Sequence, residues 1–248
     1  MTVTLIVLAH PNRASFNGAW AEATATACEA LGHEVIWSDL VALGFDAVEG
    51  AGHYNGAAAF DPLKAQEMAA QQGSVPTDVA REIAKIQQAD RIVFHFPMWW
   101  FAPPAVLKGW FDRVLMHGAL HTVDERFDRG RCRGKAALFC VTTGATDIES
   151  GPDGKEGNVD MLLWPTAYTL RYLGMAVLEP VVVHGVHGYH EGAGKAALEQ
   201  RLAGVLGGQA DVMSGFDAHV RMRFNADVDF DEDGRLRGAS VTPFIRPR

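Results

Sequence analysis

Hydrophobic residues along the chain follow two alternating patterns. Short uninterrupted apolar runs, such as TLIVLA, are typical of strands that are covered on both faces, as in a parallel sheet. Between these runs, apolar residues recur at helical spacing. The predicted strands cover residues 4–9, 34–40, 91–97, 136–144 and 176–185, and the predicted helices cover residues 16–31, 76–90, 104–116 and 159–173. This alternation predicts an α/β fold, with a doubly wound five-stranded parallel sheet and helices on both faces.

Two stretches depart from this alternation. Residues 41–76 mix glycine, alanine and polar residues over a length that exceeds an ordinary connection. Thr77 is expected to cap the helix that follows this stretch. Residues 207–248 are expected to be irregular, apart from a hairpin at FDEDGRL, residues 230–236. We expect both stretches to be elaborations of a single domain over residues 1–248.

The composition is that of an ordinary globular protein. Of 248 residues, 48% are hydrophobic and 21% are charged, and the formal net charge is −8. The basic residues are dispersed, so nucleic acid is not expected as a partner. Three scattered cysteines, Cys28, Cys132 and Cys140, lack C-x-x-C spacing and indicate a cytoplasmic location. No apolar stretch approaches the roughly 18 residues that span a bilayer and no secretory signal is present, so neither membrane insertion nor secretion is expected.

Residues that could bind a ligand or take part in a reaction lie after three of the predicted strands, where ligands bind in open α/β sheets. HPNRASFN, after the first strand, lacks the glycines of the dinucleotide-binding motif G-x-G-x-x-G. Ser15 can cap the next helix while its hydroxyl and the following amides bind phosphate, with His10 and Asn17 adding further contacts. An ordinary helix cap and a strand-end histidine explain the same residues, so both interpretations stay open.

The other two segments follow the third and fourth strands. PMWWFAPPAVLKGW places large aromatic residues in a loop, where they are costly unless they cover a flat group or close a core or an oligomer interface. The sequence TTGA, residues 142–145, offers amides and hydroxyls that suit negative charge on a reduced isoalloxazine ring, or else forms a plain turn. All three segments fall at adjacent strand ends, which favours one shared binding site.

Four blocks, HPNRASFN, FHFPMWWFAPPAVLKGWFDRVL, TTGATDIESGPDGKEGN and LLWPTAYTLRYLGMAVLEP, closely resemble the flavodoxin-like NAD(P)H:quinone oxidoreductases, the family of mammalian DT-diaphorase and its bacterial relatives. The resemblance runs in order from about Thr4 to Pro180. It implies the strand order 2-1-3-4-5 and a homodimer that holds FAD, with the active site at the interface. It also implies that hydride passes from NADH or NADPH to the flavin and then to a quinone, by a ping-pong route.

The resemblance further implies which residues form the site. The FAD pyrophosphate and ribityl region would contact His10, Ser15, Phe16 and Asn17. The isoalloxazine would lie along Pro97, Met98, Trp99, Trp100 and Phe101, with its pyrimidine edge at Thr142, Thr143, Gly144 and Ala145. The substrate pocket would be lined by Trp100, Phe101, His121 and Gly144.

Several positions differ from the family pattern, and three of them, Ser150, Glu156 and His121, are the catalytic candidates. The family's tyrosine and histidine, which relay a proton and stabilise the reduced flavin, correspond here to Ser150 and Glu156. An ionised carboxylate cannot donate a hydrogen bond, so Glu156 would act protonated or give its place to water. The family's two pocket tyrosines correspond to His121 and Val123, which implies a pocket of different polarity with His121 as a candidate proton donor.

Three other functions remain as alternatives. They are an FMN-dependent reductase of azo, nitro or chromate acceptors, a flavin-binding regulatory subunit of a membrane transport system, and a flavin-free scaffold whose aromatic loop is a protein interface. HGVHGYH spaces three histidines evenly, but a glycine-rich loop does not fix ligand geometry, so we predict no metal there. This loop and Lys195 are expected near the adenine end of FAD.

Overall fold

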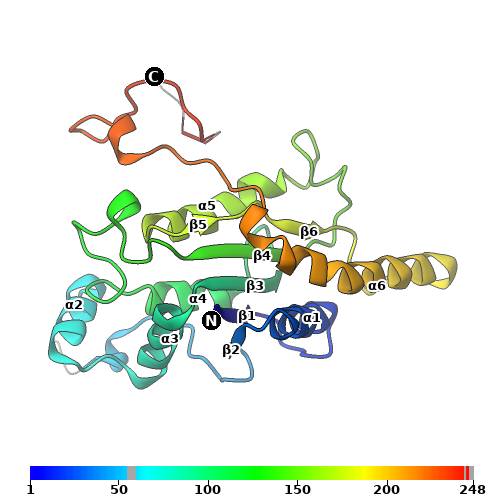
Figure 1. Cartoon of the computed structure of the whole chain (residues 1–248), viewed down its shortest axis with the longest axis horizontal. Coiled ribbons are helices and arrows are strands. Elements are labelled where there is room, and N and C mark those ends of the chain that lie inside the picture. Colours follow the sequence, from blue (N-terminus) through cyan, green and yellow to red (C-terminus); the bar gives the residue numbers. More distant parts are fainter. Residues whose placement is uncertain (55–59, 243, 246–248) are drawn as a thin grey trace.

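A central parallel sheet organises the chain (Figure 1). The computed structural model describes residues 1–54, 60–242 and 244–245. Its strands are β1 (Val3–Leu8), β2 (Glu34–Asp39), β3 (Arg91–Pro97), β4 (Ala136–Thr142), β5 (Ala176–Val177) and β6 (Val181–Val183). The order β2-β1-β3-β4-β5, with parallel pairing throughout, confirms the predicted doubly wound sheet.

The strand predicted over residues 176–185 is broken in two. β5 pairs with the start of β4 and β6 pairs with its end. Pro180 lies between β5 and β6 and has no N–H to donate to a ladder. At the break, Glu179 N donates to Val220 O at 2.8 Å, so the C-terminal segment pairs with the chain there. The sheet is therefore six-stranded rather than five-stranded.

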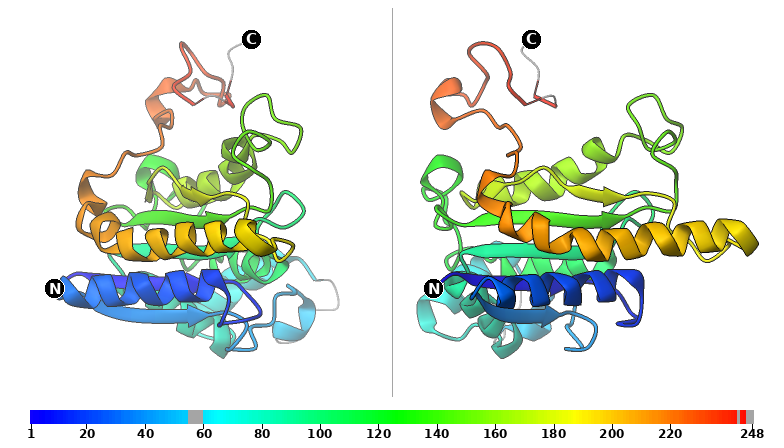
Figure 2. Two further views of the ribbon diagram at one scale, coloured as in Figure 1. Left: turned by 90° about the vertical axis from the view of Figure 1, so that its right-hand side faces the viewer. Right: turned by 45° about the vertical axis from the view of Figure 1, so that its right-hand side comes forward.

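Helices cover both faces of the sheet. They are α1 (Phe16–Ala30), α2 (Pro62–Gln72), α3 (Thr77–Gln88), α4 (Ala105–Val114), α5 (Val159–Tyr172) and α6 (Gly192–Ser214). α1 and α6 lie side by side on one face, and α3, α4 and α5 lie on the other (Figure 2). In β1, Leu5 and Val7 pack in the core beneath α3 and α4, whereas Ile6 and Leu8 pack against α1. The apolar run is therefore buried on both faces, as predicted.

The sequence pattern does not predict α6. Its glycines, each of which costs a helix about 1 kcal/mol relative to alanine, are Gly192, Gly194, Gly204, Gly207 and Gly208. Tertiary contacts offset this cost, because Gln209 accepts a 2.7 Å hydrogen bond from Trp20 Nε1 and Met213 is fully buried. The chain was expected to be irregular from residue 207 onward. This expectation is wrong for residues 207–214, which belong to α6. The first half of α6 extends past the carboxyl edge of the sheet (Figure 2).

Residues 41–76 contain helical structure that the sequence analysis did not predict. A short 3-10 helix covers Ala51–His53, α2 follows, and residues 55–59 between them lie outside the described part of the chain. Asp61 caps α2 by accepting a hydrogen bond from Lys64 N at 3.3 Å. α2 ends at Gly73, which has a φ of 66°. These are ordinary start and stop signals, but the mixed composition around them hides the helix.

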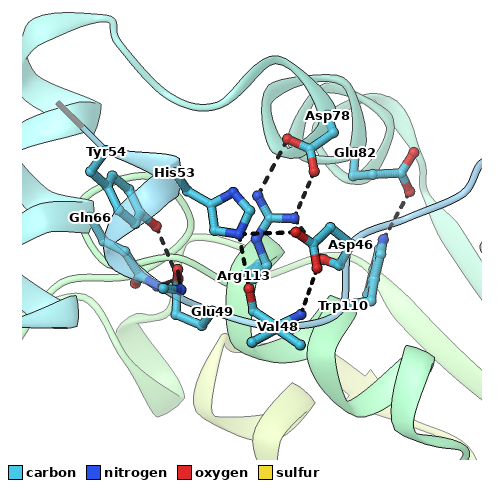
Figure 3. Close-up of polar contacts among 11 residues, drawn as sticks. Asp46, Val48, Glu49, His53, Tyr54, Gln66, Asp78, Glu82, Trp110 and Arg113 are labelled. Carbon is cyan, nitrogen blue, oxygen red and sulfur yellow. Dashed lines mark hydrogen bonds and ion pairs between the residues drawn. The ribbon is translucent and has the colours of Figure 1, made fainter.

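A buried arginine fixes this segment to the rest of the fold (Figure 3). Arg113 of α4 has a fully buried side chain that donates to Asp46 O at 2.7 Å and to the Asp78 carboxylate at 2.7 Å. A buried guanidinium needs such partners because its charge is costly away from water. Gly109, also on α4, lets the segment approach the helix, since an added Cβ would lie 2.0 Å from Ala47 O. Residues far apart in sequence therefore hold the segment in place.

The cap of α3 differs from the expected one. Pro76 is the N-cap, because its carbonyl accepts the first hydrogen bond of the helix, from Ala80 N at 2.8 Å. Thr77 is the first helical residue, so its assignment as the cap is wrong. Proline's restricted φ, −49° here, already suits the entry to the helix.

The C-terminal segment lies on the α5 side of the molecule (Figure 1). The ring of Phe244 packs 5.5 Å from the ring of Trp164 in α5. Phe230 and Leu236 form an antiparallel bridge, which confirms the predicted hairpin. Among the helices of the described residues, none is both long enough and apolar enough to cross a membrane.

Candidate active site

Three loops leave the carboxyl edge of the sheet next to one another. They follow β1, β3 and β4, which are consecutive neighbours in the sheet. Pairing continues into the loops, since Ala9 N donates to His95 O at 3.0 Å and Met98 N donates to Thr142 O at 2.7 Å. The three segments selected from the sequence therefore lie at one edge, where ligands bind in this kind of sheet.

The loop after β1 folds back over the start of α1. Ser15 is the N-cap of α1, and its Oγ accepts a hydrogen bond from Gly18 N at 3.2 Å. Within the loop, His10 Nδ1 accepts a hydrogen bond from Asn12 N at 3.0 Å. Gly18 is required because a Cβ there would lie 1.9 Å from Arg13 O. The first amides of α1 have no intrahelical acceptor, and a helix N-terminus of this kind attracts phosphate.

Asn17 joins the first loop to the third. It is 4% exposed, and its Oδ1 accepts a hydrogen bond from Thr142 Oγ1 at 3.0 Å. Its Nδ2 is buried and has no partner within the described residues. An unpaired buried donor costs about 1–3 kcal/mol, so this atom fits a bound group that carries an acceptor. The residues present therefore fit the flavin that the resemblance implies.

Residues 99–102, the aromatic turn, present two large aromatic side chains. Trp99 N donates to Ala102 O at 2.9 Å, and Ala102 N donates to Trp99 O at 3.1 Å. The central residues Trp100 and Phe101 have φ of 49° and 62°, in the left-handed region that bulky residues rarely adopt. They are nevertheless 93% and 52% exposed. Backbone strain combined with exposed aromatic surface is typical of a ligand-binding position.

The loop after β4 carries two backbone amides that are free to bind a ligand. Ala145 O accepts hydrogen bonds from Thr143 Oγ1 at 2.9 Å and from Gly185 N at 2.8 Å, which ties the loop to the segment after β6. The N–H groups of Gly144 and Ala145 find no acceptor in the part of the chain that the structure describes. Two such amides can stabilise negative charge on a bound ring.

A hollow of about 470 Å³, the flavin hollow, brings the second and third loops together. The residues selected from the sequence that line it are Met98, Trp100, Phe101, Thr143, Gly144, Ala145, Ser150 and Glu156. Ser150 is 5% exposed and Glu156 is half-buried, so both candidate proton-transfer groups face the same space as the aromatic turn. Glu149, Val159 and Leu162 also line the hollow and were not selected from the sequence.

The remaining predicted cofactor residues lie beside or behind this hollow. Pro97 and Thr142 are buried at the ends of β3 and β4. The ring of His10 lies 5.8 Å from that of Trp99, which connects the first loop to the aromatic turn. Ser15, Phe16 and Asn17 belong to the start of α1. The residues selected for the isoalloxazine and those selected for the pyrophosphate therefore lie in different parts of the same edge.

His121 lies in a second hollow, of about 850 Å³. The aromatic turn stands between the two hollows, because Trp100 and Phe101 line both. Burial, together with the neighbouring His117, lowers the pKa of His121. Within one chain, His121 and Gly144 therefore line different hollows, and the four residues expected in the substrate pocket are not gathered in one place.

Sequence reasoning did not assign His184 to this site. Its Nδ1 lies 3.1 Å from Oγ1 of Thr143, which belongs to the turn that carries Gly144 and Ala145. The even spacing of HGVHGYH grouped His184 with His187 and His190, whose rings stack on each other at 3.9 Å. The feature that points to the site is the position of His184 in the fold: it directly follows β6, and β6 pairs with the end of β4, where the third loop begins.

Comparisons with known proteins agree with this fold. Residues 2–205 match a family model described as the flavodoxin-like fold. NAD(P)H dehydrogenase (quinone) 1 of Rattus norvegicus is 36% identical over 187 residues, which cover 73% of this chain and 68% of that protein. Ribosyldihydronicotinamide dehydrogenase (quinone) of Mus musculus is 34% identical over 187 residues, covering 73% and 81%. A crystal structure of a "Putative quinone reductase" from Klebsiella pneumoniae has a TM-score of 0.85 and 28% identity, covering 96% of this chain and 94% of the other.

The sheet order and the carboxyl-edge site define a flavodoxin-like protein. The chain belongs to the flavodoxin-like family of NAD(P)H:quinone oxidoreductases. The resemblance carried by the four sequence blocks is thereby confirmed.

Proposed function

We propose that this chain reduces quinones and similar electrophiles with NADH or NADPH, by two-electron transfer through a bound FAD in a ping-pong sequence. One observation carries the proposal: Trp100 and Phe101 of the aromatic turn line the same hollow as Gly144 and Ala145, whose N–H groups have no acceptor among the described residues. The rat and mouse relatives, named as quinone dehydrogenases, support the same reaction class. The flavin supplies the capacity to accept a hydride from the nicotinamide and to pass it on.

The chain's own residues hold and orient the reacting rings. Ser15 and the first amides of α1 are placed for the pyrophosphate, and Asn17 Nδ2 is placed for an acceptor atom of the flavin. The aromatic turn walls the space in which nicotinamide and quinone stack in turn. The amides of Gly144 and Ala145 stabilise negative charge at the pyrimidine edge of the ring.

FAD is proposed rather than FMN because the carboxyl edge continues beyond the phosphate-binding region. Residues 184–190 adjoin the third loop through Val186 N, which donates to Thr143 O at 2.8 Å. α6 extends past the same edge and carries Lys195, exposed, in its first turn (Figure 2). These segments support an adenine-bearing half of the cofactor.

Ser150 and Glu156 are proposed to supply the proton that accompanies the hydride. Both line the flavin hollow, and together they offer a hydroxyl and a carboxyl group on the same side. A protonated Glu156 carboxyl can donate to an acceptor oxygen, with the Ser150 hydroxyl as a relay. The proton would therefore come from the loop after β4.

A homodimer with the active site at its interface is proposed from the exposed apolar surface. Trp100 is 93% exposed and Met161 of α5 is 55% exposed, and surface of this kind is typical of an interface. A second copy placed against the aromatic turn would bring its own His121 hollow to the substrate side. His121 would then act as a proton donor across the interface.

The cytoplasm is the proposed location of the reaction. All three cysteines, Cys28, Cys132 and Cys140, are free and buried. Thiols that stay reduced are typical of cytoplasmic proteins. Small molecules, rather than nucleic acid, are the proposed partners.

The first experiment is the absorption spectrum of the purified protein, followed by release of the chromophore with heat and its identification by chromatography. Released FAD supports the proposal. Released FMN contradicts the adenine-side assignment. A colourless protein that does not bind added FAD contradicts the proposed function.

Initial rates then test the reaction itself. NADH and NADPH are each paired with a benzoquinone and with an azo dye as acceptor. Parallel double-reciprocal lines with the quinone support the ping-pong route. Turnover with the azo dye alone contradicts the assignment of quinones as substrates.

A further inference from the structure

The side chain of His184 contacts the turn that carries the N–H groups of Gly144 and Ala145. It directly follows β6 (Val181–Val183), is half-buried, and its Nδ1 lies 3.1 Å from Thr143 Oγ1. The Thr143 hydroxyl donates its hydrogen to Ala145 O at 2.9 Å. A hydroxyl has only one hydrogen, so a Thr143 hydroxyl that donates to Ala145 O accepts from His184. In this arrangement the hydrogen of the neutral His184 ring is on Nδ1.

The contacts around this hydrogen bond fix the directions of two carbonyl groups, those of Thr143 and Ala145. Ala145 O accepts from the Thr143 hydroxyl and from Gly185 N, and Val186 N donates to Thr143 O at 2.8 Å. The backbone of the turn is thus bonded to the segment after β6, and only the Thr143 hydroxyl is free to rotate. A donor on His184 Nδ1 removes that freedom, because it holds a lone pair of Oγ1 and directs the hydroxyl hydrogen to Ala145 O.

We propose that His184 is a positioning residue for the flavin hollow: as the Nδ1–H tautomer it holds the Thr143 hydroxyl on Ala145 O and so fixes the turn from Thr143 to Thr146, which places Gly144 and Ala145 in the wall of the hollow. His184 does not line the hollow and acts only through Thr143. The inference deepens the proposed function and rests on it, insofar as the amides are taken to face a flavin.

The surroundings of His184 are consistent with a neutral ring. Burial lowers the pKa of His184, and the nearby charges are those of Asp147, Asp160 and Arg201. The Arg201 guanidinium donates to His184 O at 2.6 Å, so it holds the backbone rather than the ring. Because Nδ1 carries hydrogen in the neutral tautomer and in the charged ring alike, the bond to Thr143 does not depend on the protonation of Nε2.

The first test needs no cofactor. Nitrogen-15 NMR of the histidine rings in the flavin-free protein distinguishes the two neutral tautomers, and His184→Asn assigns the signal by removing it. The Nδ1–H tautomer at neutral pH is the expected result. An Nε2–H tautomer would overturn the inference, whether or not the protein is later found to bind flavin.

The second test uses variants that differ in one donor. His184→Leu removes the donor, whereas His184→Asn places an amide nitrogen where Nδ1 was. His219→Leu is the matched control, because His219 Nε2 lies 2.9 Å from Glu179 O and the residue lies outside both hollows. Flavin affinity, by fluorescence titration, and the rate of flavin reduction are measured for each.

His184→Leu is expected to lower both quantities about tenfold, because small misplacements of a charge-stabilising group have effects of this size. His184→Asn and His219→Leu are expected to stay within about twofold of the original protein. Equal values for His184→Leu and His219→Leu would overturn the inference. If His184→Leu fails to fold, His184→Asn and the tautomer decide. A protein that binds no flavin contradicts the proposed function, and the tautomer still decides the role of His184.

Discussion

Asn17 is the residue at which cofactor binding is most directly measurable. Asn17→Asp keeps an oxygen toward Thr142 Oγ1 and replaces the unpaired Nδ2 donor with an acceptor. We expect flavin affinity to fall at least about tenfold, or about 1.4 kcal/mol, because a donor to the flavin is lost. Fluorescence titration with FAD measures this change. Thr142→Val is the control, since it removes only the other hydrogen bond of Asn17, and equal losses in both variants would contradict the assignment.

His95 makes the stability of the protein sensitive to acid. Complete burial lowers the pKa of His95 to about 3. Its Nε2 lies 3.0 Å from Thr24 Oγ1, and its Nδ1 is buried with no partner in the described ranges. An unfolded histidine titrates near 6.5, so below about pH 6.5 the unfolded chain binds a proton that the folded chain excludes. The free energy of unfolding therefore falls as pH decreases from about 6.5 toward about 3, by at most about 1.4 kcal/mol per pH unit.

The variant His95→Gln tests this assignment. Glutamine retains a donor for Thr24 but does not titrate, so the decline of stability with acid should be shallower. Urea unfolding between about pH 7 and pH 4.5 gives the two slopes. An unchanged slope in His95→Gln would assign the acid sensitivity to other groups, and a substitution of the half-buried His219, His219→Gln, serves as the control.

Among the helices, α4 carries a position that tolerates no side chain. Gly109→Ala would place Cβ 2.0 Å from Ala47 O, so residues 41–76 must move away from the helix. We expect a loss of about 1–3 kcal/mol in the free energy of unfolding, although alanine favours a helix. Gly207→Ala is the matched control, because nothing lies within 4 Å of an added Cβ there.

The control in α6 is expected to gain up to about 1 kcal/mol. Chemical denaturation of the two variants side by side measures both changes. Similar gains in Gly109→Ala and Gly207→Ala would contradict the close approach of residues 41–76 to α4.

Elements with a strong local pattern are predictable from the sequence, whereas those stabilised by distant contacts are not. The strands β1 and β3 are nearly continuous apolar runs and were found within one residue at each end. α6 depends on the hydrogen bond between Trp20 and Gln209, which are 189 residues apart. The break after β5 likewise depends on Glu179 pairing with Val220. These contacts join residues that are far apart in sequence, so a short stretch of sequence does not reveal them.

The candidate site shows the same division. The rule for parallel sheets locates the three loops, and the family resemblance identifies most of the residues that line the flavin hollow but misses Glu149, Val159 and Leu162. The positive φ values of Trp100 and Phe101 could not be predicted, because local preference places glycine or asparagine in that conformation. The placement of His121 in a separate hollow could not be predicted either, since it depends on how the aromatic turn packs.

Considered as a whole, the molecule keeps its C-terminal segment apart from the flavin hollow. All residues that line this hollow precede residue 163. A chain that ends at Met222 keeps the 2.8 Å hydrogen bond from Met222 N to Val177 O and loses the aromatic contacts of Phe224 and Phe244 with α5. We expect this variant to be less stable and to weaken the proposed homodimer, yet to bind flavin with the affinity of the full chain.

Flavin titration and light scattering measure these properties together. Loss of flavin binding in a truncated protein that still folds would show that the C-terminal segment belongs to the site. A dimer of unchanged strength would show that this segment does not contribute to the interface.

The strained backbone of the aromatic turn lowers the stability of the protein, and in return it presents an aromatic surface that is already formed before a ligand binds. Asn-Gly is the pair that a turn with two positive φ values prefers. Replacing Trp100 and Phe101 with Asn and Gly should raise the free energy of unfolding by about 1–3 kcal/mol while turnover with quinone is lost. Denaturant unfolding and initial rates check the two effects, and a variant that loses stability would contradict the strain. Natural selection for activity must therefore keep tryptophan and phenylalanine at these two positions. A descendant protein that no longer needs the activity should accumulate Asn-Gly there. Its fold would become more stable while its activity is lost.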